Sequence, residues 1–109
     1  QCIYRSDKLV IMDVNFLLQG IHFQWNVDKA DSNLWKHGVS FEKACEVFFD
    51  PFFYPLNDDE VGDELRDVVI GLTASWRTLY VVYTMRDDVI RIISARPVTR
   101  LERLHYENQ

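Results

Sequence analysis

Residues 67–97 read DVVIGLTASWRTLYVVYTMRDDVIRIISARP, and this stretch decides the fold. It contains three runs rich in Val, Ile, Tyr and Thr, a composition typical of β-strands, over residues 67–72, 78–85 and 89–95. The connections between the runs are short and polar, and connections of this length join antiparallel neighbours. The stretch therefore predicts three antiparallel strands, and Pro97 ends the last of them.

Helical patterns precede these strands. Residues 27–37 predict a first helix, which Asn26 or Asp28 caps and which Gly38 ends. Residues 41–49 predict a second helix, because their apolar positions recur at helical spacing and a proline follows at position 51.

The remaining segments complete an α+β domain. A capping box opens a third helix over 99–107, and residues 9–23 read as one or two short strands with a break near Gly20. Residues 52–56 predict an edge strand, because they contain a proline, and 57–67 predict a loop or hairpin connection. The expected class is α+β, with two N-terminal helices and a C-terminal helix packed on a small, mainly antiparallel sheet.

Length and composition limit the classes of protein. A chain of 109 residues with 48% hydrophobic residues is expected to form a single globular domain, residues 1–109. We expect a cytoplasmic protein, because no apolar run is long enough to cross a membrane and no signal peptide is evident. Cys2 and Cys45 are too few for a disulfide scaffold, and Cys45 is predicted to be a buried thiol. Neither histidine spacing nor a glycine-rich loop indicates a metal or a cofactor, so none is expected.

The net charge of -5 is unevenly distributed. Residues 58–67 contain six acidic residues and one arginine, so the remainder of the chain is balanced. From Val68 onward there are six arginines and four acidic residues. The chain therefore has an acidic segment and an arginine-bearing C-terminal third, and the second is compatible with a nucleic-acid partner.

Four segments of the sequence resemble a known family. They read FQWNVDKADSNLWKHGVSFE (23–42), ELRDVVIG (64–71), IRIISAR (90–96) and TRLERLHYE (99–107). In order and spacing they resemble the BrnT family of ribonuclease toxins from type II toxin–antitoxin systems. The resemblance covers a toxin core over residues 20–109. Residues 1–19 lie outside it as an N-terminal extension, which is either an extra strand or an added tag.

The resemblance implies a RelE-like fold and a ribonuclease that inhibits translation. It implies a BrnA-like antitoxin of the ribbon–helix–helix type as partner, with operator DNA contacted only through that antitoxin and a dimer within the toxin–antitoxin complex. No membrane partner is expected. This chain departs from the family pattern at Gly62 and Asp63, the region in which many relatives carry a histidine shortly before the Glu-x-Arg motif.

RNA cleavage without a metal requires a base, an acid and fixed cations beside the phosphate. The predicted catalytic residues, which lie in the family segments, are His37, Glu64, Arg66 and Arg91. The predicted RNA-binding residues are Lys36, Arg96, Arg100, Arg103 and Tyr106.

Structural explanations compete with several of these assignments. His37 is equally typical of a helix C-terminus, and Glu64 with Arg66 is equally typical of a surface ion pair. In a regular strand Arg91 and Arg96 point to opposite faces, unless a bulge redirects the second arginine. Tyr106 is suited to stacking on a base or to packing through an anchored hydroxyl.

Two other functions remain open. One is a weakly active or inactive module that acts by antitoxin binding and operon autoregulation, which the acidic segment and the missing histidine favour. The aromatic residues of segment 49–54 would then contribute to the antitoxin surface. The other is a small α+β domain of unrelated function.

Overall fold

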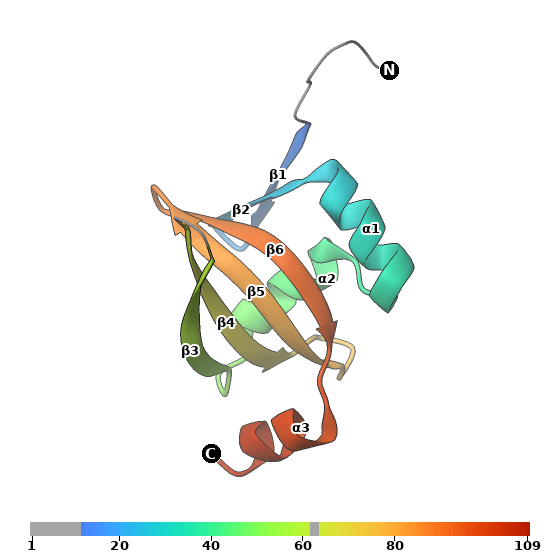
Figure 1. Cartoon of the computed structure of the whole chain (residues 1–109), viewed down its shortest axis with the longest axis vertical. Coiled ribbons are helices and arrows are strands. Elements are labelled where there is room, and N and C mark those ends of the chain that lie inside the picture. The colour runs from blue at the N-terminus through green and yellow to red at the C-terminus, as the bar shows by residue number, and fades with distance from the viewer. Residues whose placement is uncertain (1–11, 62–63) are drawn as a thin grey trace.

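One curved sheet forms the frame of the molecule (Figure 1). The computed structural model describes residues 12–61 and 64–109, and the side chains of 12–56 and 65–109. Within this part the sheet has six strands, in the order β1-β2-β6-β5-β4-β3. The strands are β1 (Asp13–Leu18), β2 (Ile21–Asn26), β3 (Tyr54–Val61), β4 (Glu64–Leu72), β5 (Thr78–Arg86) and β6 (Val89–Pro97). Only the pairing of β2 with β6 is parallel among the pairs described, so the sheet is mixed and mainly antiparallel.

The strands agree with the sequence prediction except in the acidic segment. The break near Gly20 separates β1 from β2, and β3, which contains Pro55, is at the edge of the sheet. The loop expected over 57–67 is wrong for most of its length, because β3 continues to Val61 and β4 begins at Glu64. The hairpin alternative is correct. Backbone hydrogen bonds hold such a ladder together even where the side chains are acidic.

Helix α1 (Val27–His37) begins and ends as predicted. The side chain of Asn26 accepts a hydrogen bond from the backbone N–H of Lys29, and Gly38 has the positive φ of 67° that ends many helices. Asn26 is thus the cap rather than Asp28. The C-terminal helix α3 (Arg100–Glu107) begins with the predicted capping box.

The second predicted helix is shorter than expected. Helix α2 (Phe41–Glu46) is followed by the 3-10 helix η2 (Val47–Phe49), so a single α-helix over 41–49 is wrong. Here the backbone passes directly over β4. A Cβ atom on Gly71 would lie 2.7 Å from the Cβ atom of Val47 and 2.9 Å from its carbonyl oxygen. The tighter winding accompanies this close approach, which glycine alone permits.

The hydrophobic core lies between one face of the sheet and α2 with η2, which Figure 1 shows behind β5 and β6. Phe23, Trp25 and Ile92 from the sheet meet Phe41 and Ala44 from α2, and all five are buried. Cys45 is also buried, as predicted, and burial raises the pKa of its thiol. Cys2 lies outside the described residues.

Helix α1 takes the place of a strand beside the second half of β6. Strand β2 pairs with β6 only through Phe23 and Gln24 and then continues into α1. The buried amide of Asn33 accepts a hydrogen bond from the N–H of Ala95 at 3.1 Å and donates one to its carbonyl oxygen at 2.8 Å. It also donates to the carbonyl oxygen of Val39 at 3.0 Å. One side chain therefore replaces the ladder partner that β2 no longer supplies.

Candidate functional site

The face of the sheet opposite α2, here called the open face, carries two of the predicted arginines. The register of β5 and β6 shifts between the pairs Val82–Ser94 and Tyr83–Ile92, which leaves Ile93 as a bulge. Ile92 and Ala95 consequently both face the core, although they are three residues apart. Arg91 and Arg96 both lie on the open face, so the bulge alternative is correct.

The structure brings Arg91 and Arg66 into one cross-strand row. Arg91 lies beside Gln24 of β2 on one side and beside Thr84 of β5 on the other. Asp67 pairs with Tyr83, so Arg66 follows Thr84 in the same row, and both arginines are on the open face. Neighbouring strands are about 4.8 Å apart, so the backbones of the two arginines are roughly 10 Å apart. At this spacing their side chains can reach the oxygens of the same phosphate or of two neighbouring phosphates.

A chain of hydrogen bonds extends this row onto β1. Arg91 Nη1 donates to Gln24 Oε1 at 2.6 Å, and Gln24 Nε2 donates to Asn15 Oδ1 at 3.1 Å. His22 Nε2 lies 2.9 Å from the same oxygen. Arg91 Nη2 also forms an ion pair with Asp13 at 3.1 Å, and the Arg91 side chain is 13% exposed. We call these five residues the polar network.

The polar network contains four residues that the sequence prediction missed, namely Asp13, Asn15, His22 and Gln24. His22 and Gln24 are two residues apart in a predicted extended segment, which was a signal that they share a face. The parallel pairing of β2 with β6, which brings Gln24 beside Arg91, is a long-range contact that local sequence does not specify.

Arg96 lies at the other end of the open face, near α3. Its guanidinium donates two hydrogen bonds of 2.8 Å to the carboxylate of Glu102 and lies 3.8 Å from the ring centre of Tyr80. The hydrogen bonds from Arg96 hold the pKa of Glu102 below its usual range. Arg96 therefore fixes the start of α3 to the sheet.

The other predicted residues of α3 lie at the same end of the sheet. Arg103 Nη1 donates to the hydroxyl of Thr78 at 3.3 Å, and Arg100 is exposed. The hydroxyl of Tyr106 donates to the carboxylate of Asp50, so it is anchored rather than turned to solvent. Burial and this contact raise the pKa of Tyr106 to about 12.

Lys36 and His37 lie apart from the row. Both are exposed on the last turn of α1, close to the β4–β5 turn, where Arg77 Nη1 donates to the carbonyl oxygen of Gly38 at 3.3 Å. Figure 1 shows this end of α1 well away from the hairpin at which β6 begins. The backbone of Glu64 starts β4, and its side chain lies outside the described residues. The predicted site residues therefore occupy three places on the molecule.

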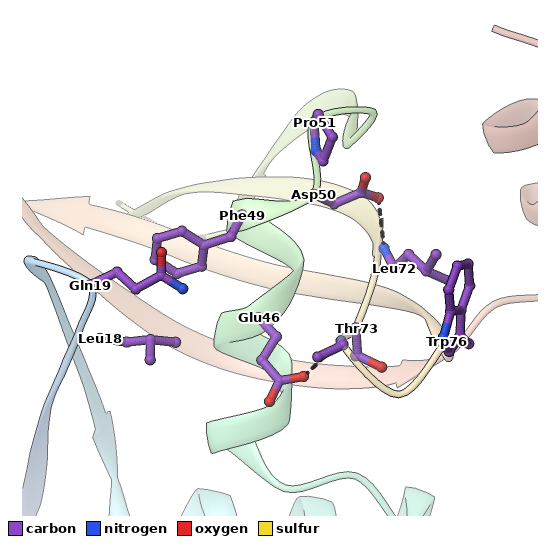
Figure 2. Close-up of a pocket in the computed structure, with 10 residues that line it drawn as sticks. Leu18, Gln19, Glu46, Phe49, Asp50, Pro51, Leu72, Thr73 and Trp76 are labelled. Carbon is purple, nitrogen blue, oxygen red and sulfur yellow. Dashed lines mark hydrogen bonds between the residues drawn. The ribbon is translucent and has the colours of Figure 1, made fainter.

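A pocket of about 410 Å³ opens on another side of the molecule (Figure 2). Two turns and the segment after η2 form its walls, and its apolar lining includes Phe49 and Trp76. The indole of Trp76 is 82% exposed. The carboxylates of Glu46 and Asp50 accept hydrogen bonds from the backbone N–H groups of Ala74 and Leu72, each at 2.9 Å, and so hold the walls together. The pocket thus combines exposed aromatic surface with acidic groups.

Two searches within residues 12–61 and 64–109 are negative. No group of three or more His, Cys, Asp or Glu side chains is arranged to hold a metal ion. No helix in this part of the chain is long and apolar enough to span a membrane.

The fold defines a small α+β protein with a mixed sheet of six strands in the part of the chain described. Residues 25–102 match the family described as the ribonuclease toxin BrnT of type II toxin–antitoxin systems. The match spans most of the chain, and the protein belongs to the BrnT family. A crystal structure of the Brucella abortus ribonuclease toxin BrnT is 18% identical, with a TM-score of 0.48 over 70% of this chain and 94% of that chain. A search of curated proteins finds no match.

Proposed function

We propose that this toxin is an RNA endonuclease that needs no metal, inhibits translation in the cytoplasm and is neutralised by a BrnA-like ribbon–helix–helix antitoxin. It acts as a single domain with a RelE-like fold. The observation that carries the proposal is the row on the open face, in which Arg91 and Arg66 flank Thr84. Two arginines on one face of a sheet can bind an RNA phosphate and stabilise the charge that develops during cleavage.

The proposed reaction is an in-line attack by the ribose 2′-hydroxyl. A base removes the hydroxyl proton, the 2′-oxygen bonds to phosphorus, and the bond to the 5′-oxygen breaks. Arg66 and Arg91 hold the phosphate, and Glu64, whose backbone begins the strand that carries Arg66, completes the predicted catalytic group. His37, also predicted to be catalytic, lies apart from this row at the end of α1. Arg100, Arg103 and Tyr106 on α3 form a flanking RNA surface, with Arg96 fixing α3 to the sheet, and Lys36 on α1 contacts the RNA at a separate place.

RNA cleavage in EDTA tests this proposal. The purified protein is expected to cut single-stranded RNA and to leave 2′,3′-cyclic phosphate ends, which mass spectrometry detects. Arg66→Ala is expected to lower the cleavage rate by about 100-fold, the usual loss when one charge-stabilising group is removed. Arg77→Ala, which removes the same charge at the β4–β5 turn, is the matched control. Intact RNA after prolonged incubation, together with normal growth of cells expressing the protein, would contradict the proposal.

One observation favours the alternative of a weakly active module that functions mainly through antitoxin binding. Arg91 is ion-paired with Asp13 and Arg96 with Glu102, so two predicted phosphate ligands already have carboxylate partners. RNA must displace at least the first partner to gain the full charge of Arg91. A protein that is non-toxic on expression and still binds its antitoxin would support this alternative over the endonuclease.

The pocket in Figure 2 is the surface that we assign to the antitoxin. Trp76 presents aromatic area beside the carboxylates of the pocket, and Phe52, two residues after Asp50, is 67% exposed. This combination suits a segment with apolar and basic side chains. Trp76→Ala is expected to weaken antitoxin binding about 30-fold, as truncation of an interface hot spot does. Trp35→Ala is the matched control, because Trp35 is 89% exposed on α1. Calorimetry with the purified antitoxin measures both, and a larger loss for Trp35→Ala would assign the interface to α1.

A further inference from the structure

We propose that His22 is the general base of RNA cleavage and that Arg91 sets its reactive tautomer through Gln24 and Asn15. The proposal rests on the endonuclease function above and assigns its base. His22 lies outside the part of the chain that matches the family, which begins at residue 25.

The hydrogen bonds of the polar network have only one consistent direction. Arginine has donors and no acceptor, so the atom of Gln24 that faces Arg91 must be the oxygen, Oε1. The amide nitrogen of Gln24 then faces Asn15, and it can only donate, so Asn15 must present its oxygen. That oxygen accepts, and the nitrogen of His22 that contacts it, Nε2, must carry the proton.

When the imidazole is neutral, its lone pair is therefore on Nδ1. The described residues provide no hydrogen-bond partner for Nδ1. His22 is half-buried, whereas Asn15 behind it is exposed on the edge strand, so the ring is held in place and still reachable from solvent. An oriented imidazole with one nitrogen hydrogen-bonded and the other free is the arrangement of a general base.

The position of His22 suits a phosphate held in the arginine row. Gln24 is in the same row as Arg91, and His22 is two residues earlier on the same strand and on the same face. The distance along the strand is about 7 Å, so an arginine-bound phosphodiester places its ribose within reach of the ring. His37 lacks this relation, because it is on the last turn of α1, beside Gly38. This chain has Gly62 and Asp63 in the region where many relatives carry a histidine, shortly before the Glu-x-Arg motif. His22 provides an imidazole on the open face.

Nδ1 of His22 takes the proton of the 2′-hydroxyl while the 2′-oxygen forms its bond to phosphorus. The bond from phosphorus to the 5′-oxygen breaks, and that oxygen takes a proton from solvent. The products are a 2′,3′-cyclic phosphate and a 5′-hydroxyl, and His22 then returns its proton to solvent.

Removal of the imidazole is the first test. His22→Ala is expected to lower the cleavage rate by about 100-fold, and added free imidazole is expected to restore part of it, as a purely structural role would not allow. His105→Ala is the matched control, since His105 stacks on Tyr54 at the far end of the sheet. A folded His22→Ala protein that cuts RNA at the wild-type rate would refute the proposal and leave the endonuclease function standing. Absence of cleavage by the wild-type protein would refute both.

Reversal of the tautomer is the second test, and its readout does not depend on activity. In Gln24→Glu the new carboxylate only accepts, so Asn15 must turn its amide nitrogen toward Glu and His22, and the imidazole proton moves to Nδ1. Asn15→Asp adds the same charge but retains an acceptor opposite His22, so the proton stays on Nε2.

Long-range ¹H–¹⁵N NMR spectra of the ring, recorded where the imidazole is neutral, distinguish the two tautomers. We expect the Nδ1–H form in Gln24→Glu alone, with a greater loss of cleavage than in Asn15→Asp. The Nε2–H form in both variants, or the Nδ1–H form in the wild-type protein, would contradict the proposed chain.

Discussion

Asn33→Leu is expected to lower the free energy of unfolding by about 3–6 kcal/mol, the largest change predicted for any single substitution in this protein. Asn33 is only 6% exposed, and its amide makes three hydrogen bonds to backbone groups of Ala95 and Val39. Leucine has nearly the same volume, so the substitution leaves little cavity. It leaves one buried N–H and two buried carbonyl oxygens without their partner, each costing about 1–3 kcal/mol.

The location of Asn33 explains why no neighbour can compensate. Its amide completes the edge of β6 where β2 has departed, so the affected groups belong to a strand that also carries Ile92 and Ala95 in the core. Water cannot replace the amide unless α1 moves away from β6. We therefore expect the variant to lose α1 packing as well as the three hydrogen bonds.

Urea unfolding monitored by circular dichroism measures the effect. Ser32→Ala, an exposed neighbour in the same helix, is the control and is expected to change stability by less than about 0.5 kcal/mol. Asn33→Asp tests the directions of the bonds, because a carboxylate accepts from the N–H of Ala95 but faces two carbonyl oxygens. It should also be destabilised. A fully stable Asn33→Asp would show that the two donated bonds contribute little.

Local signals in the sequence were sufficient for most of the fold. The caps at Asn26 and Thr99 and the end at Gly38 depend on side chains within three or four residues, and the structure has them as predicted. Strand composition likewise located the three strands of residues 67–97. Where non-local packing decides, the prediction was wrong, as at η2, whose winding accompanies contact with Gly71.

The candidate site was less predictable because it depends on register. Whether Arg91 and Arg96 share a face is decided by the bulge at Ile93, which composition does not reveal. The contact of Gln24 with Arg91 joins residues that are 67 positions apart. The sequence therefore indicated which kinds of residue a site would need, namely arginines and a histidine. Which histidine lies near Arg91 depends on the pairing of β2 with β6, and this pairing places His22 there and not His37.

Asp50 holds α3 against the sheet, and its removal is the second large effect expected. Its carboxylate accepts hydrogen bonds from the N–H groups of Phe52 and Leu72, both at 2.9 Å, and from the hydroxyl of Tyr106. Three elements thus meet at one side chain, namely the turn after η2, the end of β4 and the last turn of α3. Hydrogen bonds to a charged group contribute about 1.5–3 kcal/mol each to stability. Water can replace part of this at the half-buried carboxylate of Asp50, and the remaining loss is still substantial.

Asp50→Ala is expected to lower the free energy of unfolding by about 2–4 kcal/mol and to increase amide hydrogen exchange throughout α3. Tyr106→Phe removes only one of the three hydrogen bonds and should cost about 1 kcal/mol. In the double variant the Tyr106→Phe substitution should have almost no further effect, because its partner is already absent. Additive losses would show that Tyr106 does not depend on Asp50.

The dependence of stability on pH gives an independent measure of the same contact. The pKa of Tyr106 in the folded protein is raised to about 12, chiefly by burial and next by the hydrogen bond to Asp50, whereas the unfolded value is near 10. The folded state therefore retains the proton longer than the unfolded state, and this contribution is complete below about pH 10 and declines as the pH rises toward about 12. The stability difference between the wild-type protein and Tyr106→Phe should shrink over this interval. A difference that stays constant would mean that the hydroxyl does not bind the carboxylate in solution. Helix α3 would then be held to the sheet through the Arg96–Glu102 ion pair and the hydrogen bond from Arg103 to Thr78.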